Sequence, residues 1–101
     1  MDIKDIKGFL DDEGKVTLMP TKRRKQMLVL SYIAEQIPPD KSYTEREFND
    51  LLNTLHTFGD PATLRRELYD HFLIDRSRNG NCYTLAQNRP TAEELIEKYC
   101  G

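Results

Sequence analysis

Helix-start signals and a hairpin signal follow one another closely between residues 44 and 85. The first signal is a capping box at residues 44–47, in which the Thr44 hydroxyl and the Glu47 carboxylate each bond a backbone N–H that the helix leaves exposed. The apolar side chains after it recur at the i, i+3, i+4, i+7 spacing of one helix face: Phe48, Leu51, Leu52 and Leu55. An amphipathic helix is therefore predicted to begin at residue 45.

A second helix start lies a few residues farther along the chain. Asp60 can cap a helix, and Pro61 suits the first helical position because no backbone N–H is needed there. This helix is predicted to run to about residue 72, with an inward stripe formed by Leu64, Leu68, His71 and Phe72. Its outward face is predicted to carry Ala62, Thr63, Arg66, Tyr69 and Asp70. Two helices joined by a tight turn are expected.

A β-hairpin is predicted after the second of these helices. Asn79-Gly80 lies between residues 73–76 and 82–85, and this dipeptide favours the positive φ angles of a type I′ turn. Counting outward from the turn places four side chains on one face, as the cross-strand pairs Arg76 with Tyr83 and Ile74 with Leu85.

The chain before residue 40 is predicted to add a short strand, residues 15–18, and another helix. Thr21 can cap a helix over residues 22–36, which Pro38-Pro39 ends because proline cannot continue the hydrogen-bond ladder. One stripe of this segment is predicted to face the core: Met27, Leu30, Ile33, Ala34 and Ile37. Other large side chains lie off the stripe, so the N-terminal segment is expected to pack on the other side of the helix: Leu28, Val29 and Tyr32.

The order helix, extended piece, helix, tight turn, helix, hairpin predicts a mainly helical α+β fold, a winged helix-turn-helix with a three-helix core and a C-terminal hairpin wing. At 101 residues the chain is expected to form one domain. Residues 1–19 would be an N-terminal extension with the short strand, residues 20–87 the winged-helix core, and residues 88–101 a C-terminal helix opened by a capping box at residues 91–94.

Candidate binding residues follow from this fold. The helix after the tight turn of such a motif enters the major groove, so Thr63 and Arg66 are candidates for contacts with base edges. Arg65 is assigned a phosphate-binding or structural role, and Arg78 beside the hairpin tip is assigned a phosphate contact. Lys22 and Arg23 lie in a first helical turn, where a bound phosphate would offset their unfavourable interaction with the helix dipole.

The distribution of charged residues is also compatible with a function other than DNA binding. The net charge of −2 argues against general polyanion binding, although residues 20–89 alone carry an excess of two positive charges. The arginines of the third helix could simply complete a solvated face, Arg66 with Asp70 one turn away and Arg65 with Asp60. The alternative function is a protein-interaction or ligand-sensing accessory domain that makes no DNA contact.

Other classes of function lack their signatures. Cys82 and Cys100 do not have zinc-site spacing, and His56 and His71 have no ligand pair nearby, so no metal is expected. No phosphate-binding glycine loop or nucleophile elbow occurs, so neither catalysis nor a cofactor is expected. No apolar run is long enough for a membrane span or a secretory signal, which favours the cytoplasm. The expected partners are double-stranded DNA, a transcription regulator, or a second copy in a homodimer.

Several motifs together resemble a bacterial family of domains of unknown function, number 2087, found alone or attached to helix-turn-helix transcription regulators. The resemblance spans residues 9–83, and its carriers are residues 9–15, residues 18–20 with the basic run after them, residues 43–45 with Asn49, Asp60 with residues 64–68, and Arg76 with residues 80–83. It implies a winged-helix-like domain in a transcriptional context. The chain departs from the family pattern at Phe72, where glycine is usual, and at Asn79, where aspartate is common.

Overall fold

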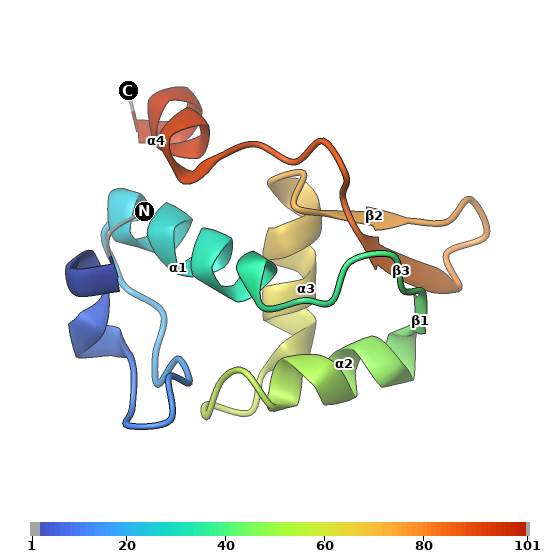
Figure 1. Cartoon of the computed structure of the whole chain (residues 1–101), viewed down its shortest axis with the longest axis horizontal. Helices are drawn as coiled ribbons and strands as arrows, with labels where there is room; N and C mark the ends of the chain where they lie inside the picture. The colour runs from blue at the N-terminus through green and yellow to red at the C-terminus, as the bar shows by residue number, and fades with distance from the viewer. Residues whose placement is uncertain (1–2, 101) are drawn as a thin grey trace.

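Four α-helices and a three-stranded antiparallel sheet make up the fold over residues 3–100, the part of the chain that this computed structural model describes (Figure 1). The helices are α1 (Arg23–Glu35), α2 (Glu45–Asn53), α3 (Pro61–Asp70) and α4 (Ala92–Cys100). The strands are β1 (Tyr43–Thr44), β2 (Ile74–Arg76) and β3 (Cys82–Leu85), and two short 3-10 helices, η1 (Ile3–Asp5) and η2 (Lys7–Phe9), precede α1. The predicted α+β class, dominated by helices, is confirmed.

The sheet has the strand order β1-β3-β2. Within the hairpin Ile74 pairs with Leu85 and Arg76 with Tyr83, which is the predicted register. The predicted turn type is wrong, because Gly80 has a φ of +75° while Asn79 is absent from the non-glycine residues with positive φ among residues 3–100. The side chain of Asn79 instead closes a longer loop, since its Oδ1 accepts from the Ser77 hydroxyl at 2.7 Å.

α1 is the central helix, and its predicted apolar stripe is buried. Leu28 and Val29 are buried as well, in a core cluster that also contains Ile6 and Val16 of the N-terminal segment. The Tyr32 hydroxyl donates to the Gly14 carbonyl at 2.7 Å and so joins that segment to the helix. The predicted cap is wrong: Lys22, not Thr21, is the N-cap residue, and its side chain makes no capping hydrogen bond.

The strand predicted at residues 15–18 does not form. Only Val16 makes β-bridges, antiparallel to Leu10 and parallel to His56. The chain bends at Leu18, whose side chain is half exposed, and the ladder does not extend beyond Val16. Val16 nevertheless holds the turn between α2 and α3, because its N–H donates to the Leu55 carbonyl at 3.0 Å and its carbonyl accepts from the Thr57 N–H at 2.9 Å.

α4 packs against α1, on the side opposite to α2 in Figure 1. Its predicted capping box is present: the Thr91 N–H donates to Glu94 Oε1 at 3.0 Å, and the Glu94 N–H donates to Thr91 Oγ1 at 3.1 Å. Leu95 is almost fully buried, so the contact with α1 is apolar.

One residue at the end of α3 that was predicted to face the core is exposed. Phe72 is 56% exposed and has a φ of +63°, whereas His71 is buried as predicted. The Leu73 N–H donates to the Leu68 carbonyl and the Phe72 N–H donates to the Tyr69 carbonyl, which is the Schellman pattern that requires a left-handed residue after the helix. This conformation turns the Phe72 side chain away from the core.

Candidate nucleic-acid interface

The start of α3 is fixed by hydrogen bonds on both sides of the tight turn. Asp60 Oδ1 accepts from the Thr63 N–H at 3.1 Å, which is the predicted N-cap. The buried ring of His56 spans the turn: Nε2 accepts from the Asp60 N–H at 2.9 Å, and Nδ1 lies 2.7 Å from the Leu52 carbonyl oxygen. The direction in which α3 leaves α2 is therefore set by the Asp60 cap and by the two contacts of the buried His56 ring.

Hydrogen bonding by Thr63, through its side chain and its backbone N–H, lowers the pKa of Asp60 below its ordinary value. The same effect operates at α2, where backbone and side-chain hydrogen bonds from Thr44 lower the pKa of Glu47. The surroundings of Glu47 and Asp60 thus favour the charged form of each carboxyl group. The negative charge also interacts favourably with the positive end of the helix dipole.

The outward face of α3 is as predicted from the sequence. Ala62, Thr63, Arg66 and Tyr69 are all exposed. The alternative pairing of Arg66 with Asp70 is absent from the ion pairs formed within residues 3–100. Arg66 is thus a solvent-facing cation on the first turns of this helix.

Arg65 has a structural role. Its guanidinium donates to Asn49 Oδ1, forms an ion pair with Glu45 at 3.4 Å, and lies over the Tyr83 ring at 5.6 Å from the ring centroid. Tyr83 in turn stacks on Phe48 at a centroid distance of 5.5 Å. Arg65 therefore joins α3 to both α2 and β3, and its charge is partly neutralised.

A hollow of about 200 Å³ lies between α3 and the hairpin. The guanidinium-bearing residues Arg65, Arg66 and Arg76 line it together with Ala62, Tyr69, Tyr83 and one acidic residue, Glu45. Arg76 was not among the predicted site residues. The hairpin register could have revealed it, because the register places Arg76 on the same face as the buried Ile74, one step beyond the core.

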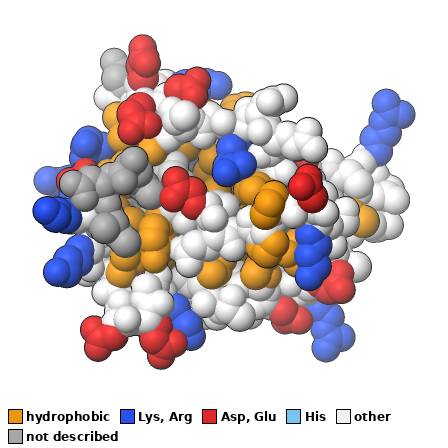
Figure 2. Space-filling model, viewed as in Figure 1, with side chains coloured by type: hydrophobic (Ala, Val, Ile, Leu, Met, Phe, Trp, Pro, Cys, Tyr) orange, Lys and Arg blue, Asp and Glu red, His pale blue; other side chains and the backbone are white. Residues whose placement is uncertain are grey.

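The other predicted binding residues lie apart from this hollow. Arg78 is exposed in the loop between β2 and β3. Lys22 and Arg23 are exposed at the start of α1, and Figure 1 places that end of α1 and the hairpin loop at opposite ends of the long axis. Figure 2 shows several basic side chains together at the left edge of the face in view, and basic and acidic side chains interspersed over the rest of it.

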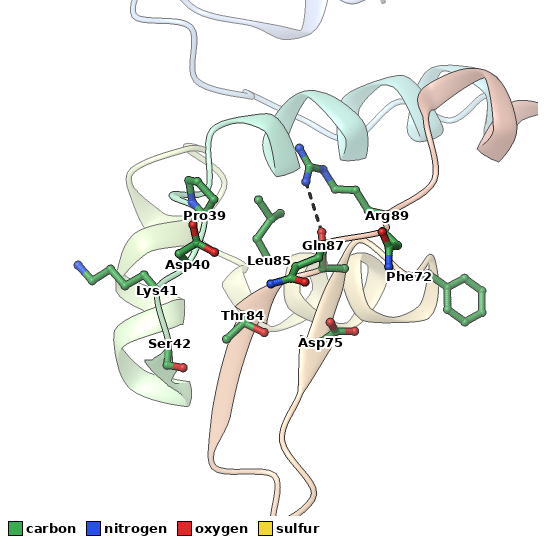
Figure 3. A pocket seen from close by; sticks show the side chains of 12 residues that line it. Pro39, Asp40, Lys41, Ser42, Phe72, Asp75, Thr84, Leu85, Gln87 and Arg89 are labelled. Atoms are coloured by element: carbon green, nitrogen blue, oxygen red, sulfur yellow. Dashed lines mark hydrogen bonds between the residues drawn. The ribbon is translucent and has the colours of Figure 1, made fainter.

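A larger hollow of about 720 Å³ lies beside the carboxyl end of β3. Figure 3 shows Asp40, Asp75, Thr84 and Gln87 around it, whereas the ring of Phe72 extends to one side. Asp40 and Phe72 both line this hollow, and they are the non-glycine residues with positive φ among residues 3–100, at +59° and +63°.

Fold and site together define a small α+β domain with an arginine-lined hollow beside one helix. The chain belongs to a bacterial family described as uncharacterized protein conserved in bacteria (DUF2087), whose family model matches residues 15–85. The resemblance predicted from the motifs is confirmed, and the match runs from before α1 to the end of β3. Searches of curated proteins and of solved structures gave no match.

Two further properties of residues 3–100 bear on the site. No helix in this part of the chain combines the length and apolar character needed to cross a bilayer. Within the same residues, no three His, Cys, Asp or Glu side chains gather as ligands for one metal ion.

Proposed function

We propose that this chain is a winged-helix domain that binds double-stranded DNA in transcription regulation, with α3 as the recognition helix and the β2–β3 hairpin as the wing. The element order from α1 to β3 supports this proposal, as does the fixed tight turn before α3. In such a complex the first turns of α3 enter the major groove and the hairpin contacts the phosphate backbone.

The exposed guanidinium of Arg66, which forms no ion pair within residues 3–100, is the observation that carries the proposal. It stands on the outward face of α3 beside Thr63, where an arginine can make a bidentate contact with guanine. Ala62 is exposed on the same face and its small side chain permits a close approach to the bases. Arg78 in the hairpin loop supplies a phosphate contact.

Fluorescence anisotropy with mixed-sequence duplex DNA at low salt tests the proposal. The wild-type protein is expected to bind, with an affinity that falls steeply as salt is raised, because phosphate contacts release counterions. Combining Arg66→Ala with Arg78→Ala should weaken binding about tenfold or more. Lys98→Ala on α4 is the control, since it removes one positive charge from a residue that does not line the hollow between α3 and the hairpin. Absence of binding by the wild type, or no effect of the double substitution, would contradict the proposal.

An accessory domain without DNA contact is the second candidate function. The larger hollow favours it, because strained backbone conformations concentrate at ligand and interaction sites and both Asp40 and Phe72 line that hollow. Pull-down from a nuclease-treated lysate tests this function. A specific protein partner that is lost on Asp40→Gly or Phe72→Ala would support it, whereas recovery of DNA alone from an untreated lysate would oppose it.

A further inference from the structure

We infer that the hollow between α3 and the hairpin is a binding site for a single phosphate group, held by Arg66 and Arg76. The inference rests on the proposed function and deepens it, because a backbone phosphate of duplex DNA would be the bound group. The same chemistry is offered by a free phosphate compound, and the experiment below distinguishes the two sources.

The charge balance of the hollow indicates an anion. Arg65 already has an acidic partner, because Glu45 lies 3.4 Å from its guanidinium. Arg66 and Arg76 form no ion pair within residues 3–100, although they line the same hollow. Positively charged side chains that line one small hollow repel each other, and an anion bound among them would reduce that repulsion.

Size and donor type narrow the anion to a phosphate group. The hollow, at about 200 Å³, is smaller than the roughly 300–1,000 Å³ that holds a drug-sized ligand, so it can admit a group but not a whole cofactor. Arginine presents a planar set of N–H donors that matches phosphate oxygens in bidentate fashion. The half-exposed Tyr69 adds a hydroxyl donor at the rim.

Gly80 acts as a positioning residue for Arg76. A Cβ at position 80 would lie 2.5 Å from Nη2 and 3.0 Å from Nε of Arg76, so the flexible end of the Arg76 side chain would have to shift. The φ of +75° at Gly80 independently favours glycine. A side chain at position 80 would therefore push the Arg76 guanidinium out of its present place.

Substitutions of Arg76 and Gly80 test the phosphate site. The affinity for duplex DNA is measured by fluorescence anisotropy over a series of salt concentrations. Arg76→Gln is expected to weaken duplex binding about tenfold and to reduce the slope of log affinity against log salt by about one. Gly80→Ala should change both quantities in the same direction but by less, because the Arg76 guanidinium is displaced and not removed. Gly59→Ala is the matched control, because Gly59 also has a positive φ, +66°, but a Cβ there meets nothing within 4 Å. Arg76→Lys separates bidentate recognition from charge and should restore only part of the affinity.

A second arm uses inorganic phosphate as the probe. The arginine Nε–Hε signals of the wild-type protein are followed by NMR during a phosphate titration. This measurement needs no substitution, so its result does not depend on the stability of a variant. Shifts confined to Arg66 and Arg76 support the site, and if duplex DNA does not bind in the first arm they identify a free phosphate compound as its ligand.

The outcomes separate the inference from the proposed function. Wild-type binding of DNA that Arg66→Ala weakens, but Arg76→Gln and Gly80→Ala leave unchanged, would overturn the phosphate site and keep the DNA-binding function. Absence of DNA binding together with phosphate shifts at Arg66 and Arg76 would overturn the DNA-binding function and keep the site. Absence of both responses would overturn both.

Discussion

Phe72 ends α3 in a conformation that side chains other than glycine rarely adopt. Its φ of +63° lets the Leu73 N–H reach the Leu68 carbonyl at 2.9 Å and close the helix. A left-handed conformation costs a residue with a Cβ roughly 1–2 kcal/mol. The side chain recovers little of that cost, because it is 56% exposed and its ring contact is with Lys98, whose Nζ lies 4.7 Å from the ring centroid.

Phe72→Gly is therefore expected to raise the free energy of unfolding by about 0.5–1 kcal/mol, because glycine adopts this conformation without the Cβ clash. Urea unfolding followed by circular dichroism measures the change. Phe72→Ala is the control, since it removes the ring but keeps the Cβ, and it should not stabilise the protein. A glycine variant less stable than the wild type would show that the ring contributes more than the backbone strain costs.

Single residues were predictable from sequence where their role depends on local chain geometry. Outward-facing Thr63 and Arg66 follow from helical spacing alone, and both are exposed. Arg65 could only be narrowed to two roles, because its partners Glu45 and Asn49 belong to another helix. The predicted register already places Arg76 on the same face as Ile74, but spacing along the chain does not show that this face lies against α3.

At the scale of elements, α3 is positioned by its N-terminal cap. The hydrogen bonds from Thr63 lower the pKa of Asp60, so the folded state binds the proton of this carboxyl more weakly than the unfolded chain does. The stabilisation is fully present above the unfolded value, about 3.9, and is lost as pH falls through the lower folded value. The cap therefore stabilises the folded protein at neutral and mildly acidic pH and loses this effect in strong acid.

Asp60→Asn should flatten the dependence of stability on pH. The amide oxygen can still accept from the Thr63 N–H, so stability near pH 7 should be almost unchanged, while the loss on acidification should be smaller than in the wild type. Urea unfolding at pH 7 and near pH 3 measures both quantities. Asp60→Ala is the matched variant, expected to be less stable than Asp60→Asn at both pH values because it removes the capping oxygen. An asparagine variant with the wild-type pH dependence would contradict this account.

Elements with start signals of their own were predicted closely, whereas elements that exist through tertiary contacts were not. The capping boxes at Thr44 and Thr91 locate the starts of α2 and α4, because side chain and backbone partners lie within one turn. The hairpin register follows from alternation, although the loop geometry differs. The bridges of Val16 depend instead on residues far along the chain, namely Leu55, His56 and Thr57, so the sequence favours a strand that does not form.

For the molecule as a whole, the proposed DNA binding depends more on where the charged residues lie than on the net charge of −2. The principal extents are 36, 29 and 21 Å, and the start of α1 lies at the opposite end of the longest one from the hairpin loop (Figure 1). Salt at physiological strength screens exposed charges beyond roughly 8 Å. Basic groups at the two ends therefore act independently, and on the proposed function a duplex at α3 would be attracted mainly by the arginines around that helix.

This separation predicts unequal effects for two charge-matched double variants. Combining Lys22→Gln with Arg23→Gln should change the Kd for duplex DNA less than about twofold, because these residues do not line the hollow beside α3 and lie far from the hairpin loop, where salt screens their charges. Combining Arg66→Gln with Arg76→Gln removes the same charge and should raise the Kd roughly tenfold or more, since both residues would contact the duplex. Anisotropy titrations at 50 and 150 mM salt compare the two. If the α1 variant loses as much affinity as the α3 and hairpin variant, DNA would have to bind along the whole length of the molecule, and the recognition role of α3 would be wrong.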